Sequence, residues 1–296
     1  MSIRALGGLA SLFAALWLLG ACASSPAPTP TPTPTVLSLR PVLASTDLAV
    51  GRNRLVFALL NPASAPIRAS AVHMALSYVQ DNTLLPKGAA QAIFRPWPAG
   101  PGGVFVAEVD FTQAGVWTAQ LTPADGEAAG DTARMVFPVA ERSATPAIGT
   151  PAPASANRTA KDVASLAELT SDLTPDPDLY AMTVAQAVLS GKPAVIAFAT
   201  PAFCQSATCG PQVEVIKRLK ANYQGQANFI HVEIYANPLA MRTDPSKGVL
   251  APAVTEWNLP SEPWVFIVDS QGKVAAKFEG YASPEELEAA LLQALG

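Results

Sequence analysis

The chain of 296 residues has a formal net charge of -4 at pH 7, and only 14% of its residues are charged. This composition excludes the clustered basic surface by which proteins bind nucleic acids, so we expect no nucleic-acid partner. Hydrophobic residues make up 50% of the chain, enough for a sizeable core, while the 28 prolines indicate substantial linkers. The length predicts about two domains at the usual size of roughly 100–200 residues each.

The N-terminus has the pattern of an export signal. Arg4 precedes an apolar run at residues 5–19, which is about as long as a signal-peptide core and shorter than the roughly 20 residues that cross a bilayer. Leu-Gly-Ala-Cys at residues 19–22 resembles the lipobox of bacterial lipoproteins, in which the signal peptide is cut before the cysteine and the sulfur carries diacylglycerol. The resemblance implies a signal peptide at residues 1–21, a lipid on Cys22, and a cell-membrane anchor facing the periplasm or the extracellular space. The alternative is an ordinary secretory signal in which Cys22 is a spare thiol.

Two segments of different character follow. Residues 22–35 are a Pro/Thr-rich tether that favours polyproline II structure and cannot form a core. Residues 36–140 alternate apolar and polar side chains over predicted strands at residues 52–60, 71–79, 103–111, 116–121 and 133–139. Such a span is typical of a β-sandwich. The Phe-x-x-Ala-Gly-Val-Trp segment ending at Trp117 resembles the immunoglobulin-like domains of the YtkA and FixH type in exported bacterial proteins, which implies an all-β immunoglobulin-like sandwich.

One residue pair in this domain raises the question of copper. His73 and Met74 are adjacent on a predicted strand, and both residue types bind copper. A single histidine on an alternating strand is usually a packed or surface residue, so we expect no metal site. Trp117 is predicted to fill the core. The domain is therefore interpreted as a binding or spacing module.

The second half of the chain has a different pattern. Residues 141–177 are a linker rich in Pro, Ala and Thr, and residues 178–296 form the next predicted domain. Its apolar spacing predicts helices at residues 184–189, 213–220, 251–257 and 283–295, and strands at residues 194–199, 228–235, 264–268 and 274–278. Ser283 and Glu286 have the spacing of a capping box at the start of the last helix.

Two cysteines, Cys204 and Cys209, lie between the first strand and the following helix of this domain. With Cys22 set aside, they form an even pair in a chain predicted to be exported, and such a pair is expected to form a disulfide, permanent or exchanging. A helix N-terminus offers partial positive charge and free N–H groups, which favour the thiolate, the attacking form of cysteine. The Cα atoms of a disulfide lie roughly 4.4–6.8 Å apart, a distance that a turn followed by a helix start allows.

The order of these elements and several motifs resemble thioredoxins. The segment Phe-Ala-Thr-Pro-Ala-Phe-Cys ending at Cys204 is similar to the strand end and turn that carry a thioredoxin's first cysteine, and Cys-Gly-Pro starting at Cys209 is similar to the start of its Cys-Gly-Pro-Cys box. The Glu-Pro pair ending at Pro263 is similar to the cis-proline motif beside the sulfurs, and residues 269–280 with the capped last helix are similar to the end of the fold. The resemblance implies an α/β thioredoxin-like fold for residues 178–296, with Pro263 against the active-site sulfurs.

Three departures from the thioredoxin pattern bear on the chemistry. Four residues separate the cysteines, instead of two, and Gln212 stands where the box has its second cysteine. Ala197 stands where thioredoxins bury an aspartate that helps to manage the proton of the buried thiol. Glu233 on the next strand can reach the same space, and a carboxyl buried there would have a raised pKa suited to proton transfer. In the alternative, Glu233 or its neighbour His231 points to an edge and is solvated.

The resemblance implies a membrane-anchored, extracytoplasmic thiol–disulfide oxidoreductase that uses no cofactor. Cys204 is favoured as the nucleophile and Cys209 as the resolving thiol, although alignment of Cys209 with the Gly-Pro motif would reverse these roles. The expected partners are proteins with dithiols or disulfides and, if the protein acts as a reductant, a membrane redox donor. Two alternatives stay open: a non-catalytic thioredoxin-like binding module with a structural Cys204–Cys209 disulfide, and a copper metallochaperone similar to the Sco proteins.

Overall fold

The computed structural model describes residues 39–97, 102–204, 206 and 208–296. The predicted signal peptide at residues 1–21, the lipidation site Cys22 and the tether at residues 22–35 lie outside the described residues. Within the described part of the chain, none of the helices is long and apolar enough to cross a membrane.

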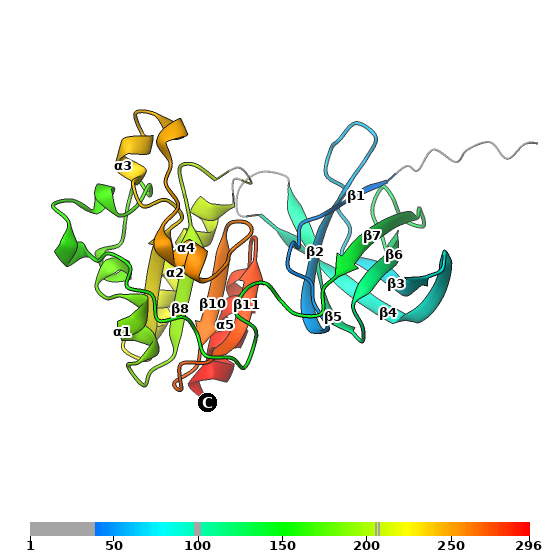
Figure 1. Ribbon diagram of the computed structural model, residues 1–296. Helices are drawn as coiled ribbons and strands as arrows, with labels where there is room; N and C mark the ends of the chain where they lie inside the picture. The colour runs from blue at the N-terminus through cyan, green and yellow to red at the C-terminus, as the bar shows by residue number, and fades with distance from the viewer. Residues whose placement is uncertain (1–38, 98–101, 205, 207) are drawn as a thin grey trace, which may run out of the picture. The chain divides into compact units, whose positions relative to one another are not determined.

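The N-terminal region is an antiparallel β-structure (Figure 1). Its strands are β1 Arg40–Leu43, β2 Gly51–Leu60, β3 Ala71–Gln80, β4 Thr83–Pro96, β5 Gly103–Phe111, β6 Gly115–Pro123 and β7 Ala133–Val139. They are hydrogen-bonded in a single seven-stranded sheet with the order β1-β2-β5-β4-β3-β6-β7. The predicted all-β character is confirmed, whereas the immunoglobulin-like arrangement of two packed sheets is not confirmed.

Alternation along the strands explains the core of this region. On β7 buried and exposed residues alternate throughout, because successive side chains of a strand point to opposite faces. Trp117 is 1% exposed and packs against Phe111, so the prediction that it fills the core is confirmed. On β3 His73 is exposed and Met74 is buried, so the two side chains lie on opposite faces and do not form a joint site.

The segment predicted as the second linker packs on the C-terminal region. It contains two short 3-10 helices, η1 Ala160–Asp162 and η2 Leu166–Glu168. The indole Nε1–H of Trp257 donates to the hydroxyl of Ser155 at 3.1 Å, and Ser155 is 1% exposed. Part of this segment therefore lies in the same hydrogen-bonded structure as the region that follows it.

The C-terminal region alternates helices with the strands of a four-stranded sheet. Its elements are η3 Pro177–Tyr180, α1 Val184–Val188, β8 Ala194–Ala199, α2 Cys209–Tyr223, β9 Asn228–Glu233, α3 Pro238–Met241, η4 Pro245–Lys247, α4 Pro252–Glu256, β10 Trp264–Val268, β11 Val274–Glu279 and α5 Pro284–Leu295. The strand order is β11-β10-β8-β9. Strand β8 runs parallel to β9 and antiparallel to β10, and β10 is antiparallel to β11.

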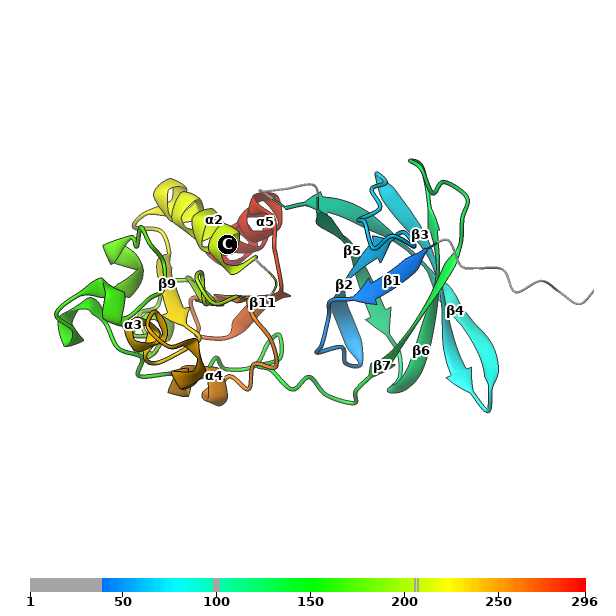
Figure 2. The same cartoon turned by 90° about the horizontal axis from the view of Figure 1, so that it is seen from above.

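Different helices cover the two faces of this sheet. Val195 and Ala197 of β8 belong to the core cluster that includes residues of α2 and α5, which lie together on one side of the sheet in Figure 2. The intervening residues Ile196 and Phe198 belong to the cluster that includes residues of α1 and α4. Because all of β8 is buried, its sequence is a continuous apolar run, as expected for a strand covered on both faces.

The start of the last helix follows the predicted pattern. The Glu286 backbone N–H donates to the Ser283 hydroxyl at 3.4 Å, and the Ser283 backbone N–H donates to the Glu286 carboxylate at 3.0 Å. The predicted capping box is therefore confirmed. These reciprocal bonds satisfy two backbone donors that a helix start otherwise leaves without partners.

Candidate functional site

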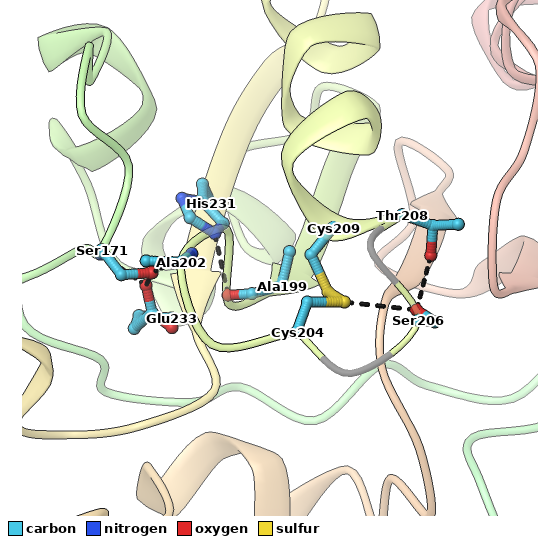
Figure 3. Close-up of a disulfide and its surroundings, with 9 residues drawn as sticks. All are labelled: Ser171, Ala199, Ala202, Cys204, Ser206, Thr208, Cys209, His231 and Glu233. Carbon is cyan, nitrogen blue, oxygen red and sulfur yellow. Dashed lines mark hydrogen bonds between the residues drawn. A yellow bond between two sulfur atoms is a disulfide. The ribbon is translucent and has the colours of Figure 1, made fainter. Parts of the chain in front are cut away.

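The two cysteines are joined where β8 leads into α2. The chain leaves β8 at Ala199, turns through residues 200–203, and reaches Cys204, while Cys209 is the first residue of α2. A disulfide joins their sulfurs, and the Cα atoms are 5.9 Å apart (Figure 3). Proline is tolerated in the first helical turn because its missing N–H would have no helical acceptor there. Pro211 is the third residue of α2 and is therefore compatible with a helix that begins at Cys209.

The two sulfur-bearing residues differ in accessibility. Cys209 has no exposed surface and belongs to the core cluster with Val213 and Ala197. Cys204 is partly exposed and packs against that cluster without being part of it. Of the two, Cys204 is the residue that a sulfur from another molecule can approach from solvent.

Two hydroxyl groups accompany the exposed cysteine. The Oγ atom of Ser206 lies 3.2 Å from Sγ of Cys204, and the Oγ1 atom of Thr208 lies 2.8 Å from Oγ of Ser206. Figure 3 shows both contacts on the side of the disulfide away from His231 and Glu233. The predictions from sequence named neither hydroxyl; their position between the cysteines was the signal that could have drawn attention to them.

His231 occupies the space beside Ala197, its register partner on the neighbouring strand. Its Nδ1 atom lies 2.7 Å from the Tyr180 hydroxyl, and its Nε2 atom lies 3.1 Å from the Ala199 carbonyl. Because a carbonyl only accepts, Nε2–H donates to Ala199. In the neutral imidazole that burial favours, Nδ1 then accepts from the Tyr180 hydroxyl. Burial lowers the pKa of His231 to about 4. The same cause raises the pKa of the Tyr180 hydroxyl.

Glu233 is tied to the turn that precedes Cys204. Its Oε2 atom accepts from the backbone N–H of Ser171 at 2.7 Å and from the Ser171 hydroxyl at 2.8 Å. The same hydroxyl oxygen accepts from the backbone N–H of Ala202 at 3.1 Å. Burial raises the pKa of Glu233, and the hydrogen bonds from Ser171 act in the opposite direction. In the view of Figure 3, Glu233 and Ser171 lie on one side of Ala202 and the sulfurs on the other.

Glu233 and His231 are only 4% and 2% exposed, so the alternative that either is solvated at a sheet edge is wrong. Sequence reasoning missed the partners of both side chains. Ser171 and Tyr180 lie 62 and 51 residues before the side chains they contact, and no local spacing rule connects positions so far apart.

Pro263 lies at the end of the sheet from which the cysteine turn emerges. The Glu262–Pro263 peptide bond is cis. The next residue, Trp264, pairs with Phe198 near the end of β8, so Pro263 follows the register toward Ala199. The Pro263 carbonyl accepts the N–H of Gly280 at 2.8 Å. This carbonyl therefore already has a partner within the fold.

The donor atoms near the cysteines do not form an evident metal site. Among the described residues, no group of three or more His, Cys, Asp or Glu side chains is arranged to hold a metal ion. Both nitrogens of His231 are engaged, by Tyr180 and by the carbonyl of Ala199. The imidazole is thus not directed at the cysteine pair as a third ligand would be.

The comparisons with known proteins concern this region. The family model for the thioredoxin-like domain matches residues 180–295. Among solved structures, the chain is similar to a thiol:disulfide interchange protein of the thioredoxin family from Chlorobium tepidum TLS, with 20% identity, coverage of 38% of this chain and 85% of that chain, and a TM-score of 0.30. It is also similar to a thio-disulfide isomerase from Thermus thermophilus, with 27% identity, coverage of 35% and 79%, and a TM-score of 0.28. The comparison with curated proteins gives no match. The family match, together with the order of strands and helices around the cysteine pair, identifies residues 180–295 as a thioredoxin-like domain.

Proposed function

We propose that this protein is a thiol–disulfide oxidoreductase that exchanges disulfides with other proteins through Cys204 and Cys209. The observation that carries the proposal is the asymmetry of the pair: Cys204 is partly exposed, and Cys209 is buried beneath it at the first position of α2. An exchanging pair needs one sulfur that a substrate can reach and a second that is held close and protected from it.

The reaction runs through a mixed disulfide. The Cys204 thiolate attacks one sulfur of a substrate disulfide; that S–S bond breaks, and the departing substrate sulfur takes the electron pair and then a proton. Cys209 then loses its proton and attacks the Cys204 sulfur, which forms the Cys204–Cys209 disulfide and releases the second substrate thiol. Two electrons and two protons pass to the substrate. In the reverse direction, a substrate dithiol reduces the Cys204–Cys209 disulfide.

Two further residues have proposed roles at this site. Pro263 is proposed to lie beside the sulfurs and to limit what can approach them; its place at the same end of the sheet supports this role. Glu233 is the proposed proton acceptor for Cys209, supported by the burial that raises its pKa. Its hydrogen bonds to Ser171 also give it a positioning role, because Ser171 holds the backbone of Ala202 just before Cys204.

We also propose that the protein is anchored outside the cytoplasm by a lipid on Cys22, as the lipobox-like sequence supports. The expected partners are exported proteins with dithiols or disulfides, and a membrane redox donor if the protein acts as a reductant. Cells that produce the Cys22→Ala variant should release the protein from the membrane fraction, whereas the unaltered chain should stay there and incorporate labelled fatty acid. Retention of the variant in the membrane would contradict the anchor.

The second candidate is a binding module in which the disulfide is a permanent clip. The four-residue spacing between the cysteines and the alanine at position 197 favour it, because both depart from the pattern of a thioredoxin active site. The two candidates differ in reduction potential, since structural disulfides typically lie below about -300 mV. A potential in that range, with no exchange on a peptide disulfide, would exclude the oxidoreductase.

The decisive experiment is trapping with the Cys209→Ser variant, in which a mixed disulfide at Cys204 cannot be resolved. The full chain is produced in cells, free thiols are blocked, and the disulfide-linked partners are mapped by mass spectrometry. We expect partners attached through Cys204, and none through this site in the matched Cys204→Ser variant. Attachment through Cys209 in the Cys204→Ser variant, and none in Cys209→Ser, would reverse the two roles.

A further inference from the structure

The hydroxyl pair beside the disulfide has a defined direction of hydrogen bonding. A sulfur in a disulfide or a thiolate carries no proton, so in the contact between Cys204 and Ser206 the hydroxyl must donate. This contact uses the only proton of Ser206. The bond between Ser206 and Thr208 must then be donated by Thr208. Thr208 thus donates to Ser206, and Ser206 donates to the Cys204 sulfur; we call these two hydrogen bonds the hydroxyl relay.

The position of Thr208 explains why its hydroxyl serves Ser206 instead of the helix. Thr208 is the N-cap residue of α2, and threonine at this position usually accepts a backbone N–H from the first helical turn. Here its backbone angles of φ -100° and ψ -16° are helical instead of extended, and its side chain makes no capping hydrogen bond. Thr208 is 6% exposed, and its hydroxyl has Ser206 as its partner.

We propose that Ser206 is a further catalytic residue, which stabilises the Cys204 thiolate by hydrogen bonding to its sulfur, and that Thr208 is a positioning residue that orients and polarises Ser206. This proposal rests on the proposed function, because it concerns the sulfur that attacks the substrate. It assigns a role to residues that the longer spacing between the cysteines brings to the site.

The effect of the hydroxyl relay depends on the charge of its acceptor, the Cys204 sulfur. A hydrogen bond to an ionised group is roughly twice as strong as one between neutral groups, so the relay stabilises the thiolate more than the thiol or the disulfide. It therefore lowers the pKa of Cys204. It also stabilises the reduced form of the pair, which makes the pair a stronger oxidant. Removal of the Ser206 hydroxyl should reverse both effects.

The test measures the pKa of the Cys204 thiol from the pH dependence of its alkylation by iodoacetamide. The full chain carries Cys209→Ala, so that the Cys204 sulfur stays free, and modification of the peptide that contains Cys204 is followed by mass spectrometry. We expect Ser206→Ala to raise this pKa by about one unit, a tenfold loss of thiolate below the pKa. Thr208→Val, which keeps the shape of the side chain, should raise it by less.

The matched control is Ser206→Thr, which retains a hydroxyl and should keep the pKa within a few tenths of the parent value. An unchanged pKa in Ser206→Ala, or an equal rise in Ser206→Thr, overturns the proposal. Because Ser206 is exposed, its substitution leaves the core intact, and a purely structural role would not move the pKa. Trapping through the Cys209→Ser variant tests the proposed function independently, so failure of one proposal can be told from failure of the other.

Discussion

Ala197 on β8 and His231 on β9 are register partners in the parallel strand pair beneath the cysteine turn. Thioredoxins, which this region resembles, carry an aspartate at the place of Ala197. Here the neighbouring side chain is an imidazole that burial holds neutral and two hydrogen bonds hold in place. The protein therefore has a buried, uncharged base beside the strand that leads to the cysteine pair, where the thioredoxin pattern has a carboxyl group.

This arrangement makes stability depend on pH below neutrality. Burial lowers the pKa of His231 from 6.5 to about 4, so the unfolded chain binds a proton more readily than the folded one. The stability is fully present above pH 6.5 and is lost as the pH falls toward about 4. The loss between pH 7.5 and pH 5 should be about 2 kcal/mol. Urea unfolding at pH 7.5 and pH 5 should show this loss in the unaltered chain but not in His231→Gln. An equal change in the free energy of unfolding in both proteins would contradict the assignment to His231.

The Tyr180 hydroxyl should contribute to the same buried pair. Tyr180→Phe leaves Nδ1 of His231 without its donor in a site closed to water, and a buried polar atom without a partner costs about 1–3 kcal/mol. The matched control is Tyr223→Phe, which removes a hydroxyl bonded at 2.8 Å to Glu288 at the partly exposed end of α2. The free energy of unfolding at pH 7.5 should fall clearly in the first variant and by less than about 0.5 kcal/mol in the second. Similar losses in the two variants would show that the buried hydrogen bond of Tyr180 to His231 contributes no more to stability than an exposed one.

The segment at residues 141–177 should be part of the folded unit. Ser155→Ala removes the acceptor of the buried Trp257 indole N–H, and we expect a loss of about 1–3 kcal/mol for the unpaired donor. The exposed Ser246 of η4, whose hydroxyl donates to Asp244, provides the control, and Ser246→Ala should be nearly neutral. Chemical unfolding compares the two. A neutral Ser155→Ala would mean that this segment is a spacer after all.

Local patterns predicted the fold around the cysteines well. The continuous apolar run of β8 and the capping box at Ser283 are both present in the structure, because each depends on neighbours within a few residues. The start of α2 at Cys209 was predicted less exactly than its apolar face, since Gly210 and Pro211 show no apolar spacing. Strand β4 was not predicted, because most of its side chains are exposed and its sequence lacks alternation.

The surroundings of the candidate site could not be predicted in the same way. Glu233 was singled out because a carboxyl group on an apolar strand is unusual, and the structure does bury it. Its partner Ser171, however, comes from the segment interpreted as a linker, and the contact exists only in the folded chain. The orientation of the His231 ring likewise depends on Tyr180 and on the Ala199 carbonyl, neither of which a sequence pattern specifies.

The proposed proton transfer at Glu233 and its positioning role can be separated by two variants. Glu233→Gln removes proton transfer and should slow attack of Cys209 on the mixed disulfide by at least about tenfold, with loss of one ionisation from the pH profile of that step. Ser171→Ala breaks the link to Ala202 but leaves the carboxyl group, so it should lower the rate at every pH without removing the ionisation. Stopped-flow measurement of single-turnover resolution from pH 5 to pH 9 distinguishes them. If Glu233→Gln and Ser171→Ala give the same profile shape, Glu233 only positions the turn that carries Cys204.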